Sequence, residues 1–248
     1  MVRKESRHNA GREARICDSF NTAELTPKII YVHIFDLIMN DGRREAIIAS
    51  VNRGIKRAAE QYNTFTGGLS ELSWGPEYLI TVNIAEELSA SVKPSYVYLE
   101  ERMSQTYEPG DEAPETFGSS KRFDVVLRNS KKFPEAVIEV KNRVHGPSKG
   151  VKKDLKRLTD HVKPFDSGEQ IFELGIFAFY LAYYKEKQGK SPEKRLLETY
   201  DDLREVLEEL SSEFGLKVDE KLFERPTKYD SPRAVWGGGC FTLEAKRV

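Results

Sequence analysis

The chain contains little cysteine and no long apolar stretch. Its two cysteines, Cys17 and Cys240, lie almost a chain length apart among 248 residues, so they suggest neither a metal-ligand pair nor a disulfide framework. This usage is typical of the reducing cytoplasm, where we expect the protein. No apolar run approaches the roughly twenty residues that span a bilayer, and the polar residues 1–7 lead into no apolar core. The sequence therefore predicts no membrane partner and no signal peptide.

Histidine is scarce, and the net charge is close to zero. The four histidines lie at no recognised metal-binding spacing, and no serine lies in a nucleophile-elbow motif. The 39 basic and 40 acidic residues nearly cancel, which argues against a nonspecific nucleic-acid coat protein. A nuclease is not excluded, because binding depends on where the charges lie and not on their sum. With 39% apolar and 32% charged residues, the composition is that of a globular protein with one sizeable core.

The first 74 residues divide into two regions. Residues 1–24 form a basic arm, either a solvated terminus or a phosphate-binding segment. Residues 25–74 predict a helical region packed on the core, with a clear helix over 43–62 whose apolar residues recur at helical spacing. The apolar run 29–39 indicates a further helix, with a strand as the alternative. Asn40-Asp41-Gly42 is interpreted as the end of that segment.

Residues 75–184 predict an α/β core. The expected elements are a helix over 76–92, strands over 95–103, 122–128 and 135–144, a basic helix over 151–162, and a strand over 171–184. Loops rich in proline, glycine and polar residues separate them. The last strand is apolar and aromatic throughout, so we expect both of its faces to be covered. The order is therefore helix, three strands, helix, strand.

Residues 185–248 predict a long helix and further strands. The helix opens at Ser191-Pro192. Its apolar residues follow alternating steps of four and three, at Leu196, Tyr200, Leu203, Leu207, Leu210 and Phe214. This seam either packs against the domain's own core, which we favour, or forms a homodimer. The tail adds a strand or two, including 239–245, and Gly237-Gly238-Gly239 is interpreted as a turn because it lacks the context of a phosphate-binding loop.

Three charged side chains lie inside apolar strands of the core. Asp124 interrupts the run 123–127, and Glu139 and Lys141 interrupt the run 136–144. Side chains alternate faces along a strand, so Glu139 and Lys141 project to the same side. Charges at such positions are costly to bury unless they are paired or coordinate a cation. The pattern therefore indicates a site, with structural ion pairs in the sheet as the alternative.

If the two strands pair as a hairpin, Asp124 and Glu139 converge on one oxygen-rich cavity. Such a pair suits Mg²⁺, a hard cation that is held by one or two carboxylates and keeps several waters. The Lys141 ammonium could orient or help deprotonate an attacking water, and could stabilise charge that develops on a phosphate. These groups together are what phosphodiester hydrolysis requires.

At Asp124 and Glu139-Val140-Lys141 the sequence resembles the PD-(D/E)XK nuclease superfamily, which carries an acid on its second core strand and Asp/Glu-x-Lys on its third. The resemblance implies a restriction-endonuclease-like αβββαβ core, with extra N-terminal helices and a long helix after it. It implies that both acids bind Mg²⁺, or Mn²⁺ in its place, together with the Val140 carbonyl. It also implies that Lys141 positions or activates the attacking water. Phe123 replaces the family's usual proline, at a position with no part in hydrolysis. We expect DNA as the substrate.

A further acid from the first core helix is common in this family. The candidates are Glu77, Glu86 and Glu87. Counting 100° per residue places Glu77 with the inward stripe of apolar residues, Glu86 on the opposite side and Glu87 near the boundary. Glu77 is therefore the preferred metal or water ligand. The alternative is a glutamate that is favoured in the first turn by the helix dipole.

The basic helix that follows the site clusters four lysines within two turns, Lys149, Lys152, Lys153 and Lys156. A basic surface beside a carboxylate site suits docking of a phosphate backbone, and a solvated helix face is the alternative. The function predicted from the sequence is a metal-dependent nuclease, of restriction type or structure-selective. A nucleic-acid-binding or scaffold protein with a degenerate nuclease fold is the rival interpretation.

Overall fold

The computed structural model describes residues 39–102, 121–164, 171–223, 227–228 and 235–245. The predictions for the basic arm 1–24 and for a helix or strand over 29–38 fall outside these residues. The helices are α2 (Asp41–Phe65), the 3-10 turn η1 (Leu72–Trp74), α3 (Glu77–Ser91), α5 (Lys149–Val162) and α6 (Pro192–Ser212). The strands are β1 (Ser95–Arg102), β2 (Arg122–Asn129), β3 (Pro134–Asn142), β4 (Leu174–Tyr183), β5 (Leu216–Leu222), β6 (Thr227–Lys228) and β7 (Val235–Ala245).

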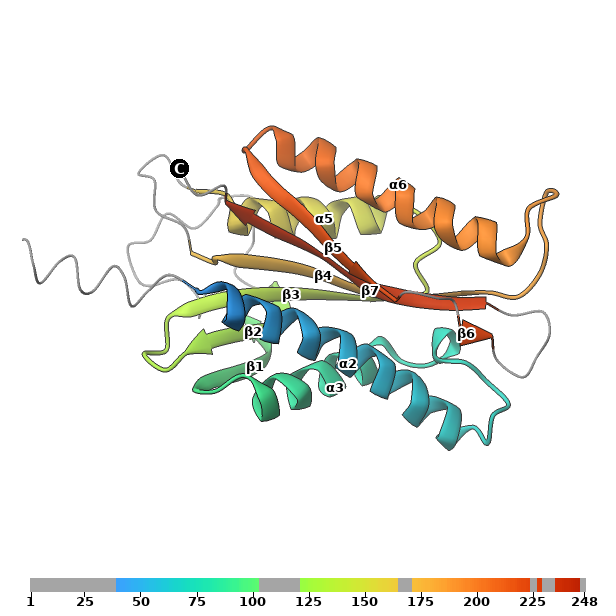
Figure 1. The fold of residues 1–248 in the computed structure, drawn as a ribbon, viewed down its shortest axis with the longest axis horizontal. Helices are drawn as coiled ribbons and strands as arrows, with labels where there is room; N and C mark the ends of the chain where they lie inside the picture. Colours follow the sequence, from blue (N-terminus) through green and yellow to red (C-terminus); the bar gives the residue numbers. More distant parts are fainter. Residues whose placement is uncertain (1–38, 103–120, 165–170, 224–226, 229–234, 246–248) are drawn as a thin grey trace, which may run out of the picture. The chain divides into compact units, whose positions relative to one another are not determined.

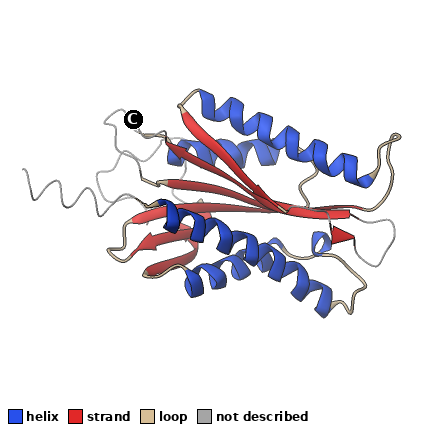
Figure 2. Cartoon of the chain, in the orientation of Figure 1, coloured by secondary structure: helices blue, strands red, loops and turns tan. Residues whose placement is uncertain are grey.

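The strands of the described part of the chain, drawn in red in Figure 2, form one mixed sheet. Their order is β1-β2-β3-β4-β7-β5, with the short β6 also paired to β7. The pairing is antiparallel throughout except between β3 and β4, which run parallel. A parallel pair needs a crossover connection, and α5 supplies it. The expected order of helix, three strands, helix and strand is thus observed from α3 to β4.

Helices cover both faces of the sheet and form two cores. The helices α2 and α3 lie on one face, and α5 and α6 lie on the other (Figure 1). Every residue of β4 is buried, as expected for a central strand. Alternate residues of β3 enter the two cores: Ile138 and Val140 pack toward α2 and α3, whereas Val137 packs toward α5 and α6.

The helix α2 begins where the sequence suggested a stop. The Asn40 side chain accepts a hydrogen bond from the Arg43 N–H at 2.8 Å and so caps the first turn. The sequence Asn-Asp-Gly is compatible with both the end and the start of a helix. The hydrogen bond from Arg43 shows that it starts one here. The apolar residues of the helix, among them Ile47, Val51 and Ile55, are fully buried at the predicted helical spacing.

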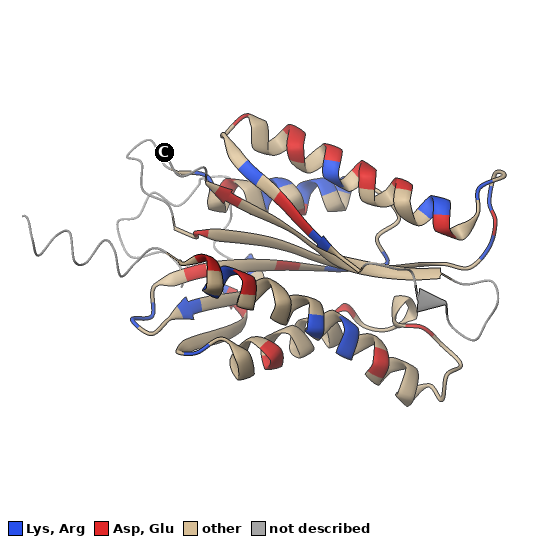
Figure 3. Ribbon diagram, viewed as in Figure 1, with Lys and Arg blue, Asp and Glu red and all other residues tan. Residues whose placement is uncertain are grey.

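The apolar seam of α6 is buried within the chain. Leu196, Leu203 and Leu207 belong to the core between this helix and the sheet. The prediction that the seam packs on the domain's own core is confirmed. A homodimer stays a prediction, and this stripe is not free to form its interface. The outer side of α6 is acidic (Figure 3).

The three glycines 237–239 lie inside β7, so the prediction of a turn there was wrong. A Cβ at Gly237 would collide with the Tyr200 hydroxyl of α6. Gly239 has a φ of 147°, which side chains rarely adopt. The run therefore serves close packing of β7, and the tail contributes three strands where one or two were expected. Separately, none of the helices in the described residues has the length and apolar content needed to cross a bilayer.

Candidate active site

The pairing of β2 with β3 brings the two predicted acids together. Val125 lies opposite Ile138, and Asp124 and Glu139 are the next residues along this antiparallel register. The preceding pair on the same side, Val126 and Val137, packs in the core beneath α5. Asp124 and Glu139 therefore face the α5 side, and Lys141 joins them there because strand side chains alternate.

Asp124 is bound to the backbone of the opposite strand. Its Oδ2 accepts a hydrogen bond from the Val140 N–H at 2.7 Å. Burial raises the pKa of Asp124, the Val140 N–H and the Lys141 charge oppose this, and the nearby carboxylates of Glu77 and Glu100 raise it further. Glu100 was not predicted from the sequence. It lies in β1 between the residues paired with Val125 and Phe123, and its φ of 52° marks an irregularity in that strand.

Glu139 is almost completely buried and is held by an arginine of α5. Its carboxylate accepts hydrogen bonds from Nε of Arg157, at 3.0 Å, and from Nη2 of the same side chain. Burial raises the pKa of Glu139 to about 8; the Arg157 charge opposes this effect, and the negative charges of Asp124 and Asp154 add to it. An arginine fork satisfies both carboxylate oxygens, as a buried carboxylate requires.

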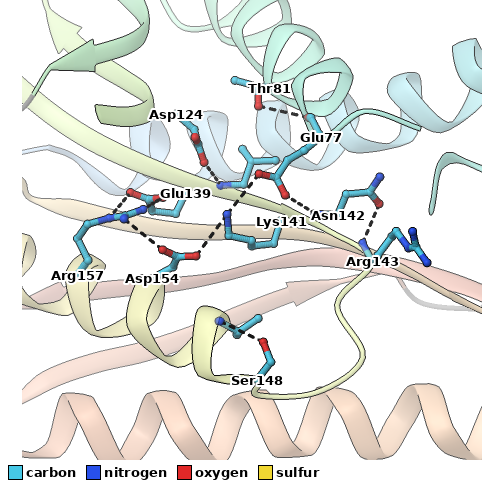
Figure 4. Close-up of polar contacts among 12 residues, drawn as sticks. Glu77, Thr81, Asp124, Glu139, Lys141, Asn142, Arg143, Ser148, Asp154 and Arg157 are labelled. Carbon is cyan, nitrogen blue, oxygen red and sulfur yellow. Dashed lines mark hydrogen bonds and ion pairs between the residues drawn. The ribbon is translucent and has the colours of Figure 1, made fainter. Parts of the chain in front are cut away.

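Lys141 lies between two carboxylates from opposite sides of the sheet. Its Nζ is 3.3 Å from Glu77 Oε1 of α3 and 3.3 Å from Asp154 Oδ2 of α5 (Figure 4). Glu77 Oε2 also accepts the Asn142 N–H at 3.0 Å. The inward position predicted for Glu77 is therefore observed, whereas Glu86 and Glu87 pair with arginines of α2.

Asp154 and Arg157 complete the cluster, and neither was predicted to belong to it from the sequence. Asp154 Oδ1 lies 3.2 Å from Nη1 of Arg157, so one chain of ion pairs runs from Glu77 through Lys141, Asp154 and Arg157 to Glu139. Counting helical turns from the buried Val151 and Leu158 would have placed Asp154 on the inward face of α5.

The charge of Lys141 is fixed by this cluster. Burial by itself would lower the pKa of Lys141, but the carboxylates of Glu77, Asp154, Asp124 and Glu139 outweigh it and raise the pKa above its usual value. The side chain is therefore an ammonium at neutral pH. It can attract or stabilise negative charge and donate hydrogen bonds, but it has no free electron pair with which to accept a proton.

The cluster carries an excess of negative charge. It contains four carboxylates, from Glu77, Asp124, Glu139 and Asp154, against the two cations Lys141 and Arg157. The raised pKa values of Asp124 and Glu139 reflect burial and this excess. A divalent cation would balance it and would favour the ionised form of both carboxyls.

The donor set also limits which ion fits. The described residues contain no group of three or more His, Cys, Asp or Glu side chains arranged to hold a metal. Zinc sites take three or four such protein ligands. Mg²⁺ differs, because it keeps several waters and is commonly bound by one or two carboxylates. The adjacent carboxyls of Asp124 and Glu139 fit that smaller requirement, and the Arg157 fork on Glu139 would have to shift for the metal to reach it.

An open cleft adjoins the cluster and has a volume of about 750 Å³. It is lined by the end of β3, the loop that follows it and the first turn of α5. Lys141 and Asp154 contribute to the lining from the cluster, and Asp202 contributes from α6. Ser148 lies at the cleft as the N-cap of α5, accepting the Val151 N–H at 3.3 Å. A helix N-terminus carries partial positive charge and favours anions.

The positive charges of three side chains act on His145, which lines this cleft. Burial lowers the pKa of His145, and the positive charges of Arg143, Arg195 and Lys187 lower it further. Arg195 stacks over Tyr183 with its guanidinium carbon 4.0 Å from the ring centroid. These cations come from separate loops and helices, so no local pattern in the sequence indicates that they meet.

The four lysines predicted to contact nucleic acid project from the outer side of α5. Lys149, Lys152, Lys153 and Lys156 are all exposed. Lys156 lies 3.6 Å from Asp160 one turn later. The helix thus presents two different faces, with Asp154 and Arg157 directed inward and the lysines directed outward. Both a docking surface for phosphates and a solvated face are compatible with this arrangement.

Comparison of the chain with protein-family models, with curated protein sequences and with solved structures found no match. The chemistry of the site is therefore inferred from its own residues.

Proposed function

We propose that the protein is a metal-dependent nuclease that hydrolyses phosphodiester bonds, with DNA as the expected substrate and the cytoplasm as the expected location. The observation that carries the proposal is the convergence of Asp124, Glu139 and Lys141 at one point of the sheet. A buried carboxyl and a partly buried one beside an ammonium are the groups that a divalent cation and a phosphate require together.

The topology supports the same proposal. Asp124 lies on the second strand and Glu139-Val140-Lys141 on the third strand of an αβββαβ arrangement. This is the position of the acid and of the Glu-x-Lys motif in the PD-(D/E)XK superfamily, which the sequence resembles. We therefore propose a restriction-endonuclease-like core that runs from α3 to β4, extended by α2, α6 and the strands β5 to β7.

In the proposed reaction, Asp124 and Glu139 hold the metal, and the Val140 carbonyl is the third candidate ligand. When bound, Mg²⁺ supplies a polarised phosphate and a more acidic water. Lys141, held as an ammonium, stabilises the charge that develops on the phosphate and orients the water by donating to it. Glu77 keeps the ammonium in place by contacting both Lys141 Nζ and the Asn142 N–H.

Two rival interpretations are weighed against this proposal. Structural ion pairs explain the Arg157–Glu139 contact, but they do not explain why the cluster contains more carboxylates than cations. A binding protein with a degenerate nuclease fold would need cations for the phosphates but not Asp124, Glu139 and Lys141 together. The enzyme is therefore the better-supported interpretation.

The test is incubation of the purified protein with single-stranded DNA, duplex DNA and RNA, in Mg²⁺ and in EDTA. We expect cleavage in Mg²⁺ alone. Asp124→Asn should reduce it to the EDTA level because a metal ligand is removed. Lys141→Ala should lower the rate by about 10²–10³-fold, the usual cost of losing a charge-stabilising donor.

The matched control is Glu135→Gln in the same strand, which removes a buried carboxylate that lies outside the cluster. It should retain cleavage in proportion to its folded fraction, measured by circular dichroism. Full activity in folded Asp124→Asn would contradict the proposal. The absence of cleavage of every substrate by the unmodified protein would contradict it as well.

A further inference from the structure

A tryptophan is held on the surface immediately before the candidate site. Trp74 ends the turn η1, three residues before Glu77, and its side chain is 60% exposed. Exposing a large aromatic ring forgoes the free energy that its burial would give. An exposed ring beside a reactive cluster is therefore a candidate ligand contact.

The turn that carries Trp74 is fixed to the end of β3. Asn142 Nδ2 donates to the Leu72 carbonyl at 2.7 Å and to the Gly75 carbonyl at 3.0 Å. Ser73 is hydrogen-bonded to the Tyr184 hydroxyl, and Leu72 is fully buried. The exposed ring thus projects from a rigid base, which lowers the entropic cost when a ligand contacts it.

Arg143 extends this ring into a stacked surface. Its guanidinium carbon lies 4.8 Å from the centroid of the Trp74 ring, and the Tyr184 ring lies 6.3 Å from Trp74 on a tilted plane. Arg143 has a φ of 60°, a strained conformation for a residue with a side chain. Strain of this kind persists where the surrounding contacts require it. We define Trp74 and Arg143 as the stacking pair.

The stacking pair lies next to both the reactive cluster and the cleft. Arg143 follows Lys141 by two residues, directly after the end of β3. Arg143 also lines the cleft, and Figure 4 shows its side chain directed away from the cluster at the end of β3. A group stacked on the pair and a phosphate at Lys141 would therefore lie at the same cleft, because Lys141 and Arg143 both line it.

The cleft offers contacts for the phosphates that would accompany such a group. Lys141, Arg143 and the N-terminus of α5 line the cleft, together with the acids Asp154 and Asp202. The charges of Lys187 and Arg195 also act on His145 of this lining. Cations supply affinity for a phosphate backbone, whereas flat aromatic and guanidinium surfaces take the faces of bases. Both kinds of contact occur here side by side.

We propose that the stacking pair binds an unpaired base of a nucleic-acid strand whose phosphates follow the cleft, so the protein prefers single-stranded or splayed nucleic acid. Inside a duplex, neighbouring bases cover both faces of every internal base, so away from the duplex ends only an unpaired base can offer a face to Trp74 or Arg143. This inference rests on the proposed function, because it places the scissile phosphate at Lys141. Its test is a binding measurement that needs no catalysis.

The test uses the full chain in EDTA, with a fluorescent single-stranded 12-mer and a blunt duplex of the same sequence, measured by anisotropy. We expect tighter binding of the single strand. Trp74→Ala should weaken that binding by about 5- to 150-fold, which corresponds to the usual energy of one stacked base, and should leave duplex binding nearly unchanged. Trp74→Phe should restore part of the affinity, because a smaller ring remains.

Phe133→Ala is the matched control. Phe133 is also an exposed aromatic residue, but it lies at the opposite end of β3 from Lys141, and its removal should leave both affinities unchanged. Equal weakening in Phe133→Ala and Trp74→Ala would overturn the stacking pair, and so would an unchanged affinity in Trp74→Ala. If Trp74→Ala loses only single-strand binding while no nucleic acid is cleaved in Mg²⁺, the binding of an unpaired base by the stacking pair stands, and the nuclease proposal falls together with the scissile phosphate at Lys141. If cleavage occurs but duplex and single strand bind alike, the nuclease proposal stands and the inference falls.

Discussion

Strand β3 buries two glutamates, and each is held by the fork of an arginine. Near the start of the strand, Glu135 accepts Nε and Nη2 of Arg43, the latter at 2.7 Å. Four residues later, Glu139 accepts the same two kinds of donor from Arg157. Both carboxylates are nearly inaccessible to solvent. By these local contacts the two pairs are almost identical.

Their surroundings differ. Arg43 also donates to the carbonyls of Lys93 and Pro94, so the pair at Glu135 ties α2 to the segment before β1. The pair at Glu139 continues through Asp154 to Lys141, and Asp124 lies beside it. One pair joins elements of the fold, and the other belongs to a cluster with surplus acid. Buried charge alone therefore does not distinguish the two pairs; the unbalanced charge around Glu139 does, and it supports the proposed site.

The largest effect is expected when each arginine is removed in turn. Arg43→Ala and Arg157→Ala should each lower the free energy of unfolding by about 3–5 kcal/mol, because each leaves a buried carboxylate without its partner. Addition of Mn²⁺ should separate the two variants. In Arg157→Ala the ion no longer competes with the guanidinium and should recover about 2.7 kcal/mol at one hundred times its Kd.

Arg43→Ala should gain from Mn²⁺ only what the unmodified protein gains. Thermal denaturation with and without the ion measures all three proteins. If Mn²⁺ shifted none of their melting temperatures, the distinction between the two pairs would disappear, and the cluster at Glu139 would be structural like its counterpart.

An intermediate effect is expected from the pH dependence of stability, through His161 near Arg157, the partner of Glu139. Burial, helped by the charges of Arg157, Lys121 and Lys163, lowers the pKa of His161 on α5 to about 3. The unfolded chain binds a proton near pH 6.5 and the folded chain does not, so the stability from this group is complete above pH 6.5 and falls as the pH is lowered toward 3.

His161→Gln should remove this dependence. Between pH 7 and pH 5 the unmodified protein should lose about 2 kcal/mol more than the variant in urea denaturation. Subtracting the two proteins cancels the titration of other groups, Glu139 included. Parallel curves for the two proteins would show that His161 is not held in its neutral form.

The smallest effect is expected on nucleic-acid binding by the outer face of α5. This face carries exposed lysines, whereas the inward face carries the ion pairs. The double variant Lys152→Ala/Lys153→Ala should weaken nucleic-acid binding several-fold and reduce the slope of log K against log salt by about 0.9 for each phosphate that is no longer neutralised. Affinities measured between about 50 and 200 mM salt, where this effect is large, give the slope. An unchanged slope would identify this face as merely solvated.

Much of the core could be predicted because its signals are local. The burial of Ile47 and Val51 follows from helical spacing, and the common side of Glu139 and Lys141 follows from strand alternation. Glu77 was placed correctly by counting turns of a helix. The same count applied to α5 finds Asp154, so this residue too could be predicted from the sequence.

Other features depend on contacts that a single sequence does not reveal. Asn142 reaches Leu72 across 70 positions, and no local pattern announces that contact. The glycines of β7 resemble a turn until the Tyr200 hydroxyl of α6 is placed against Gly237. Glu100 and Arg143 have a positive φ, a backbone conformation that the sequence does not indicate for these residue types. Such residues are determined by tertiary packing, which overrides local preference.

Asn142 connects the stacking pair with the candidate site. Its side chain holds the turn that carries Trp74, and its backbone N–H holds Glu77, which contacts Lys141. If the protein is the proposed nuclease, a replacement at this position would disturb both its substrate preference and its reaction rate. We therefore expect that, in a library selected for a new preference, accepted changes fall at Trp74 or Arg143 and spare position 142.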